Sequence, residues 1–585
     1  MFIFRFIYPV KYFPRHYLRQ AFFARTGHLP MRSTASLTEE NETTGILKLS
    51  VNWKEPGTIN VPWYSKRFGL TFFSTEVLRP RSQPFYLLRE LVRGQMSRIV
   101  KREYDWERKG LLISDAVKNA IQSARRKMVR FLTKDPSDPD FDAVGVAAFE
   151  YILQTSHRLL DQFLEQSLYA RKVQTEAYPI FVGGRSFQLK HFERFNETYP
   201  SYSDAFQVWN TCYTWRQLEP EPGVYRWDLL DRFIEASRKN NLDPVFGPIV
   251  QWDRESLPEW LLGSLEEPYT LRQHLFRYGD ELIRRYAPVI QKWVVASGLG
   301  SEMDYILVQK RVEWADTMAR QIRQLNPDAL LLVGIERPWG DALRFKSEIP
   351  PLELAETLLQ RRVFNGFLVS FNYGLSPEAT LPRDAFELNM LLDQWSSLGK
   401  PLYFSFSVPS APSTFDPLWE TADGKAEPIC TPHTQQENVN RTFLSLLTRK
   451  TIRGIFWNCF DDLASDADLL VAEEGAEDLR DDTKSLSELN DDEETTRRPE
   501  KGARKNSSAQ AGGKEESGSV EELIIADEEM PQAKILEPEE VEIASFDDSP
   551  DHMTLSFPHS GLVNADGTPK PAFRKLAALR GAYLG

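Results

Sequence analysis

The chain has 585 residues, well beyond the roughly 150 of an average domain, which predicts several structural units. Its formal charge is −13, but residues 471–551 hold 26 acidic against 9 basic residues, so this stretch carries −17 and the remainder +4. A nearly neutral remainder argues against nucleic-acid binding through a basic surface. Three cysteines are too few for a disulfide framework. The sequence contains no run of about 18 apolar residues, so no membrane-spanning helix is expected.

Residues 1–44 are basic and aromatic. Arg5, Lys11 and Arg15 interrupt every apolar run, whereas a signal peptide requires an unbroken apolar stretch of about 7–15 residues. We therefore expect a disordered leader, or a start codon upstream of the natural one at Met31, with a targeting segment as the alternative. The lack of a clear signal peptide and the few cysteines favour a cytoplasmic location.

In residues 45–175 the spacing of apolar residues changes from that of strands to that of helices. Residues 45–80 alternate apolar and polar side chains in short runs, which predicts a few strands. After Pro84 the apolar residues recur at helical spacing, and further helical stretches follow near 112–133 and 142–170. We expect a small α+β unit over residues 45–175, and its sequence carries no recognisable chemical signature.

From about Pro179 short apolar runs alternate with amphipathic stretches. The expected strands lie near 180–185, 205–210, 244–251, 290–297, 329–335, 366–372, 402–408 and 454–460. Helices are expected between them, and a last one at 571–584. Eight strand-then-helix units predict parallel strands, and eight strands close a barrel. The expected fold class is therefore α/β, a (β/α)8 TIM barrel formed by residues 176–464 and 552–585.

Residues 465–551 interrupt the last of these units. They are rich in Asp, Glu, Ser, Thr and Gly and almost lack aromatic side chains. Such a composition buries too little apolar area to offset the entropy of ordering, so we expect a disordered acidic insertion. An acidic segment that binds a protein partner is the alternative. A loop at this place leaves the C-terminal face of the barrel, where barrel enzymes have their active sites.

A segment after the second expected strand resembles the family 10 glycoside hydrolases. It reads Trp215-Arg-Gln-Leu-Glu-Pro-Glu-Pro-Gly-Val-Tyr-Arg-Trp-Asp228, in which Pro222-Gly223 predicts a turn and Asp228 a helix cap. Similar stretches follow in the family's order at 247–252, 257–260, 286–295, 326–333, 364–367, 399–403, 454–457 and 569–573. The resemblance covers neither residues 1–175 nor the acidic insertion. It implies a barrel that binds or acts on β-linked glycans.

The resemblance also implies two catalytic glutamates, and neither is present. Retaining glycosidases require a carboxylic acid and a carboxylate nucleophile about 5–5.5 Å apart. Alignment with the family places Ser297 at the acid position on strand 4, where a hydroxyl group is too weak an acid, and Phe406 at the nucleophile position on strand 7. Positions that contact sugar in the family hold Thr214, Pro248, Ser370 and Asn372.

Two interpretations of this loss remain open within the carbohydrate-active class. Either the barrel binds a glycan without the family's reaction, or other carboxylates have replaced the missing pair. Glu302 and Glu336 are the candidate substitutes at the correct face of the barrel. Asp253, Asp461 and Asp462 also follow strands. Each of these five carboxylates fits a helix cap or a solvated loop better than a catalytic role. A third interpretation, outside this class, is a non-catalytic interaction scaffold.

Aromatic side chains beyond the strand ends are candidates for sugar contact, because pyranose rings stack on aromatic faces. They are Trp215, Trp252, Trp260, Trp339, Tyr373 and Trp457, with Asp253 and Asn372 as polar contacts. We expect Trp339 and Tyr373 to lie furthest out in loops, and packing within the barrel is the alternative for Trp260 and Trp457. The expected ligand is an oligosaccharide or glycoside.

No cofactor or metal is expected. The histidines lack the spacing of metal ligands. Gly183-Gly184 follows an apolar run, but the sequence contains neither a GxGxxG pattern nor a P-loop, so a turn is the simpler interpretation of this pair.

Overall fold

A computed structural model of the chain describes most residues outside the acidic insertion. The described residues are 1–7, 15–25, 29–39, 44–65, 69–174, 179–185, 195–199, 205–211, 213–301, 306–344, 349–374, 379–411, 419–420, 426–427, 431–462, 560–564 and 568–584. They belong to one compact unit. The disorder predicted for 465–551 therefore concerns residues outside the described part.

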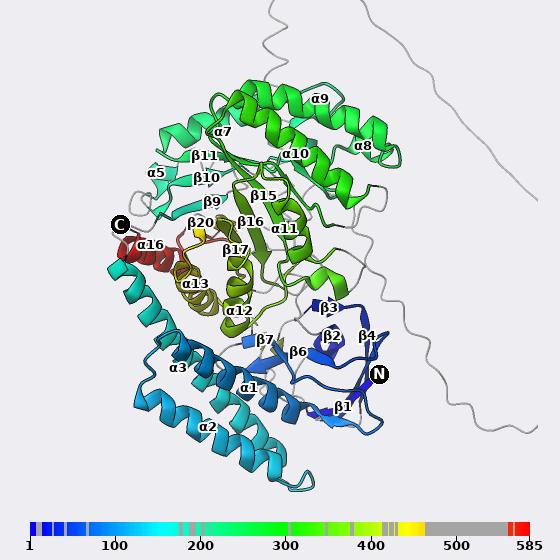
Figure 1. Ribbon diagram of the computed structural model, residues 1–585, viewed down its shortest axis with the longest axis vertical. Coiled ribbons are helices and arrows are strands. Elements are labelled where there is room, and N and C mark those ends of the chain that lie inside the picture. The colour runs from blue at the N-terminus through cyan, green and yellow to red at the C-terminus, as the bar shows by residue number, and fades with distance from the viewer. Residues whose placement is uncertain are drawn as a thin grey trace, which may run out of the picture. The chain divides into compact units, whose positions relative to one another are not determined.

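Eight parallel strands form a closed barrel in the order β10-β11-β13-β15-β16-β17-β20-β9 (Figure 1). Their bounds are β9 (Phe181–Arg185), β10 (Val208–Asn210), β11 (Asp243–Phe246), β13 (Lys292–Val294), β15 (Leu330–Glu336), β16 (Gly366–Asn372), β17 (Leu402–Ser407) and β20 (Ile452–Trp457). Each overlaps an expected strand, so the predicted TIM barrel is confirmed. Two short strands, β12 (Val250–Gln251) and β14 (Ala296–Ser297), pair beyond the C-terminal ends of β11 and β13.

Helices surround the barrel (Figure 1). The longer ones are α7 (Trp227–Lys239), α9 (Pro268–Tyr286), α10 (Val308–Leu325), α11 (Pro351–Leu359), α12 (Ala385–Ser396), α13 (Pro432–Leu447) and α16 (Pro571–Tyr583). Short elements lie in the loops: α5 (Phe195–Thr198), α6 (Trp215–Leu218), α8 (Glu259–Leu262), the 3-10 turn η3 (Asp341–Arg344), and the hairpin β18 (Trp419–Glu420) with β19 (Ala426–Glu427). Asp228 does not cap α7 as predicted, because the helix already begins at Trp227 with Arg226 as its N-cap.

The barrel interior is filled by a separate apolar cluster that contains one buried residue from each of seven strands. These residues are Val208, Val245, Val294, Leu332, Leu368, Tyr403 and Phe456. Successive side chains of a strand point to opposite faces, so this cluster identifies which residues face inward. On β15, β16, β17 and β20 the inward series includes Glu336, Asn372, Ser407 and Asn458. The intervening apolar residues pack outward against the helices.

The first part of the chain forms two four-stranded sheets, in the orders β4-β5-β1-β8 and β3-β2-β6-β7, with three helices. The elements are β1 (Phe2–Ile7), the 3-10 helix η1 (Arg15–Gln20), β2 (Phe22–Arg25), β3 (Leu29–Met31), β4 (Ser33–Glu39), β5 (Thr44–Val51), β6 (Gly57–Ser65), β7 (Gly69–Ser74), β8 (Phe85–Tyr86), α1 (Leu87–Arg108), α2 (Asp115–Thr133) and α3 (Phe141–Gln174). The α+β character expected for residues 45–175 agrees with these elements.

The expectation of a disordered leader over residues 1–44 is wrong for the described residues of that stretch. Strand β1 pairs antiparallel with β5, and Phe2, Phe4 and Phe6 are buried. Arg5, which interrupts the apolar run in the sequence, is exposed on the other face of the strand. Arg5, whose charge argued against a signal peptide, is thus the outward-facing residue of an amphipathic strand.

The N-terminal sheets and helices pack directly onto the barrel. The Phe72 N–H donates to the Pro382 carbonyl (3.0 Å), and Trp106 of α1 stacks on Phe386 of α12 at a centroid distance of 5.6 Å. Arg171 of α3 donates to the carbonyl of Arg449 (2.8 Å) just after α13. The two parts therefore share buried contacts.

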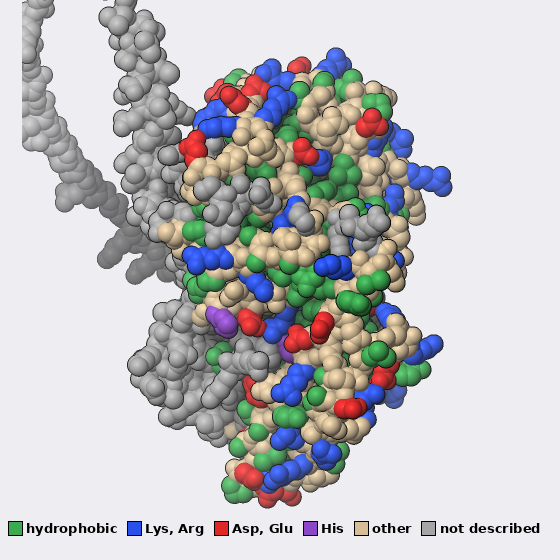
Figure 2. Space-filling model, turned by 90° about the vertical axis from the view of Figure 1, so that its left-hand side faces the viewer, with side chains coloured by type: hydrophobic (Ala, Val, Ile, Leu, Met, Phe, Trp, Pro, Cys, Tyr) green, Lys and Arg blue, Asp and Glu red, His purple; other side chains and the backbone are tan. Residues whose placement is uncertain are grey.

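One face of the molecule shows how charged side chains are distributed among the described residues. On the face in Figure 2, acidic and basic side chains are interspersed among the described atoms. None of the helices in the described part is both long and apolar enough to span a membrane.

Candidate functional site

Polar side chains occupy the C-terminal strand ends, above the apolar layer of the barrel interior. We call these eight residues the mouth ring: Arg185, Asn210, Gln251, Ser297, Glu336, Asn372, Ser407 and Asn458. Three are asparagine, one is glutamine and two are serine, so the ring contains a single carboxylate and a single guanidinium group. Catalytic and binding residues of TIM barrels lie at this end.

Glu336 is the carboxylate of the mouth ring. Its Oε1 atom accepts hydrogen bonds from the Gln251 amide (3.0 Å) and from the backbone N–H of Gly298 (3.0 Å). Arg337, the next residue, adopts a left-handed backbone conformation (φ 46°), which is unusual for a residue other than glycine. Such strain is concentrated at functional sites. The neighbouring strand therefore holds the Glu336 carboxylate in a defined position.

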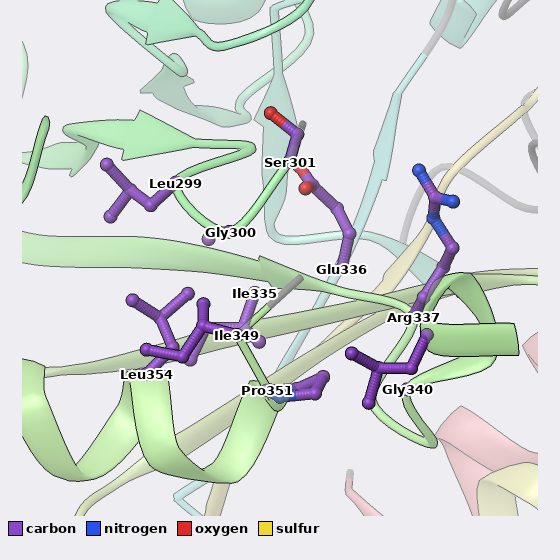
Figure 3. Close-up of a pocket in the computed structure, with 12 residues that line it drawn as sticks. Leu299, Gly300, Ser301, Ile335, Glu336, Arg337, Gly340, Ile349, Pro351 and Leu354 are labelled. Atoms are coloured by element: carbon purple, nitrogen blue, oxygen red, sulfur yellow. The ribbon is translucent and has the colours of Figure 1, made fainter. Parts of the chain in front are cut away.

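A small pocket lies beside Glu336 (Figure 3). The Glu336, Arg337 and Ser301 side chains rise on one side of it, whereas Ile349, Leu354 and other apolar residues form the opposite wall. Its volume is about 40 Å³, which is room for a few water molecules. By itself this pocket is too small for a pyranose ring.

Ser297 lies where the resemblance implies the general acid. Its side chain is buried and points at Gly334 of β15, because a Cβ atom at Gly334 would lie only 1.7 Å from the Ser297 Oγ. A larger residue at position 334 would therefore force the Ser297 side chain to move. The structure thus fits a small hydroxyl side chain at this position and leaves little space for a larger one.

Phe406 does not face the mouth. It packs outward, stacked on Phe371 (5.6 Å) and edge-on to Trp457 (5.2 Å). The inward residue at this end of β17 is Ser407, whose hydroxyl donates to Asn372 Oδ1 (2.7 Å). The same oxygen accepts from the Asn458 amide (2.9 Å). The inward-facing residue beside Phe406 is thus Ser407, and neither residue has a carboxylate.

The other proposed carboxylates differ in their surroundings. Asp253 follows β12 and accepts a hydrogen bond from the Ser256 N–H (2.7 Å), as expected of a turn cap. Burial, followed by weaker repulsion from Glu255 and Glu336, raises the pKa of Asp253 to about 6. Asp462 accepts from Lys570 Nζ (2.6 Å) and the Gly561 N–H (3.0 Å), which fixes the start of α16. Glu302 lies outside the described residues.

Five of the six aromatic side chains predicted to contact sugar are buried. Trp252 and Trp457 are 0% and 1% exposed, and Trp215 stacks on Tyr278 of α9 (4.8 Å). Trp339 and Tyr373, expected furthest out in loops, are 9% and 6% exposed. Trp260 is partly buried and donates to the Glu219 carbonyl (3.0 Å). These rings contribute to packing, and their role in ligand contact remains a prediction.

The motif that carries the resemblance is organised by a buried carboxylate. Glu219 accepts from the Trp215 indole (2.7 Å), from the Gly223 N–H (2.8 Å) and from Arg277 (2.5 Å). Gly223 has a left-handed backbone (φ 80°), consistent with the predicted turn. The Tyr225 and Trp227 rings stack beside it at 4.7 Å. The segment thus stabilises the loop after β10.

Sequence reasoning missed five members of the mouth ring: Arg185, Asn210, Gln251, Ser407 and Asn458. Each ends or follows an apolar run, and only the direction in which its side chain points distinguishes it from ordinary strand or loop residues. Asn210 is buried, and its Oδ1 atom has no hydrogen-bond partner among the described residues. Within the same part of the chain no group of three or more His, Cys, Asp or Glu side chains is arranged to hold a metal ion.

The chain matches no protein-family model and no curated protein. Its fold is similar to solved xylanases. Xylanase 10B from Thermotoga maritima is 12% identical (TM-score 0.41; 72% of this chain, 98% of that one). Xylanase 10B from Thermotoga petrophila RKU-1, solved with xylobiose, is 16% identical (TM-score 0.36; 52% and 86%). GH10 from Paenibacillus barcinonensis is 10% identical (TM-score 0.42; 72% and 97%).

The last of these is named as GH10, the family that the sequence motifs resemble. The barrel assignment itself rests on the closed strand order.

Proposed function

We propose that the mouth of the barrel binds a neutral oligosaccharide or glycoside without the standard retaining mechanism. The mouth ring is the observation that carries the proposal. Its amide and hydroxyl groups supply both donors and acceptors, as sugar hydroxyl groups require. The free oxygen of Asn210 and the positioned carboxylate of Glu336 add acceptors for the same purpose.

The absence of hydrolysis is supported by the residues at the two positions that the resemblance assigns to carboxylates. One holds the buried Ser297, and the other holds Phe406 with Ser407 as its inward neighbour. Neither a hydroxyl nor a phenyl group replaces a carboxylate in forming and breaking a glycosyl-enzyme bond at neutral pH.

Titration calorimetry with xylobiose and xylotetraose, preceded by a glycan array, tests this proposal. We expect Glu336→Gln and Asn372→Ala to weaken binding at least tenfold, because each removes a hydrogen-bonding group from the mouth. Glu356→Gln is the matched control, since Glu356 is exposed on α11. Equal thermal unfolding midpoints would show that the variants are folded. A wild-type chain that binds no glycan would favour the interaction scaffold, with residues 465–551 as the candidate protein-binding segment.

Hydrolysis with relocated carboxylates is the second candidate, and one observation favours it. Asp253 has a pKa of about 6, so it can hold a proton near neutral pH, and it senses the charge of Glu336. A protonated acid near an ionised carboxylate is the arrangement that glycosidases use. Turnover of aryl β-glycosides that is lost in both Asp253→Asn and Glu336→Gln would establish this reaction and contradict the binding-only proposal.

A further inference from the structure

A groove lined by arginine side chains lies at the opposite end of the barrel from the mouth. It is formed by the last turns of α10, the end of α11 and the residues before β16. We call it the arginine groove and define it by Arg320, Arg323, Gln324, Gln360, Arg361, Arg362, Val363 and Asn365. Its volume is about 660 Å³, and it is open to solvent.

All charged side chains that line the groove are positive. Four guanidinium groups and three primary amides line it, and no carboxylate is among the described lining residues. Asp316, just outside, is held by Arg320 through two hydrogen bonds of 2.9 and 3.2 Å. Glu313, one turn earlier, pairs with Lys310 (2.9 Å). The nearest acids are therefore already partnered.

The four arginines differ in how they are held. Arg323 donates to the carbonyls of Pro327 (2.5 Å) and Ala329 (2.7 Å) and to Asn365 Oδ1 (2.7 Å), which fixes its guanidinium group at the wall of the groove. For Arg361 and Arg362 no side-chain hydrogen bond or ion pair with another described residue is observed. Their guanidinium groups are therefore not hydrogen-bonded within the described part of the chain, although the pKa of Glu313 is lowered by its hydrogen bond with Lys310 and, to a smaller extent, by the charge of Arg361.

Arg362 has a left-handed backbone conformation, with φ at 57°. This conformation costs an ordinary residue about 1–2 kcal/mol and costs glycine almost nothing. An arginine at this position therefore places a charge where a glycine would be the more stable choice. Residues held in such conformations are concentrated at sites of ligand contact.

We propose that the arginine groove binds the phosphate group of a small molecule. A phosphate monoester carries about −1.5 to −2 at pH 7, which matches the two guanidinium charges of Arg361 and Arg362, whereas a carboxylate carries only one. The planar donors of arginine match the oxygens of phosphate, and the amides of Gln324, Gln360 and Asn365 supply or accept further hydrogen bonds. This inference is independent of the function proposed for the mouth.

Calorimetric titration of the full chain at constant ionic strength tests the inference. The probes are inorganic pyrophosphate, glucose 6-phosphate and unphosphorylated glucose. We expect binding of at least one phosphate probe and a tenfold or greater loss of affinity in the double variant Arg361→Ala/Arg362→Gly. Glycine suits the backbone at position 362, so the variant is expected to keep its unfolding midpoint. Preference for pyrophosphate would indicate an inorganic ligand, and preference for glucose 6-phosphate an organic phosphate.

Arg238→Ala is the matched control, because Arg238 is an exposed arginine in the last turn of α7 and lies outside the groove. It should leave the affinity unchanged. The inference is overturned if the wild-type chain binds neither phosphate probe, if the double variant binds them equally well, or if Arg238→Ala weakens binding as much as the double variant does.

Discussion

Burial raises the pKa of the Asp253 carboxyl group. Its folded-state pKa of about 6 lies above the ordinary value near 4, so the folded protein retains a proton that the unfolded chain has already released. Stability should therefore fall as the pH rises from about 4 to about 6, and remain lower above that window. Each unit of pKa difference corresponds to about 1.4 kcal/mol.

Asp253→Asn should remove this dependence. The amide oxygen still accepts from the Ser256 N–H, but the side chain no longer needs to ionise in a buried place. We expect the variant to be more stable than the wild type by about 1–3 kcal/mol at pH 7, and by little at pH 4. Urea unfolding of both proteins across this range measures the difference. Parallel stability curves would contradict the raised pKa.

The start of α12 is held by a buried polar network that spans both parts of the molecule. Arg383 pairs with Asp341 (2.5 Å) and, more distantly, with Glu387 (3.5 Å). Glu387 also accepts from Ser74 Oγ of β7 (2.9 Å), and Asp384 caps the helix by accepting from the Glu387 N–H (2.8 Å). All of these side chains are buried. One helix end thus connects two barrel loops to the N-terminal sheet.

Arg383→Met tests this network. The substitution keeps most of the side-chain volume but leaves the Asp341 and Glu387 charges buried without their partner, which should cost about 3–5 kcal/mol of unfolding free energy. Arg284→Met is the control, because its pair with Asp280 is exposed and should contribute less than about 1 kcal/mol. Urea denaturation measures both. Similar losses in the two variants would show that the buried network adds no specific stability.

At the scale of the whole molecule, the N-terminal sheet supports the loop that follows β16. Phe22, Ala24 and Phe72 of the sheet bury Leu381 of this loop. In the same loop, the Thr380 N–H donates to the Asn372 carbonyl (2.8 Å), and Asn372 belongs to the mouth ring. Packing between the two parts is thereby connected to the geometry of the mouth.

Phe72→Ala should therefore loosen the mouth as well as destabilise the fold. Removal of the buried ring should cost about 3–5 kcal/mol, and amide hydrogen exchange at Thr380 should become faster than in the wild type. Val129→Ala, at an exposed position of α2, is the control for an apolar truncation. Unchanged exchange at Thr380 would show that the loop does not depend on the sheet.

The sequence was sufficient to locate all eight barrel strands, because each is a short apolar run with a helix after it. It was less informative about which side chains of each strand point into the barrel. Phe406 and Ser407 are adjacent in sequence, but only the closed barrel decides which of them points inward. Arg5 interrupts an apolar run in the sequence, and its strand partner β5 lies about 40 residues further along the chain, so the local sequence does not reveal the strand. Trp457 and Asn458 are also adjacent in sequence, but Trp457 packs outward against Phe406, whereas Asn458 donates to Asn372 in the mouth ring.

The acidic segment leaves and re-enters the barrel at neighbouring points, since Asp462 and Gly561 are hydrogen-bonded to each other. The entropic cost of closing a flexible loop grows only by about 0.6 kcal/mol for each doubling of its length. If the expected disorder of residues 465–551 holds, the barrel should tolerate changes in the length of chain between these two residues. This junction can accept a reporter domain with adjacent termini, and it offers a route to label the protein beside its mouth without altering either of its cores.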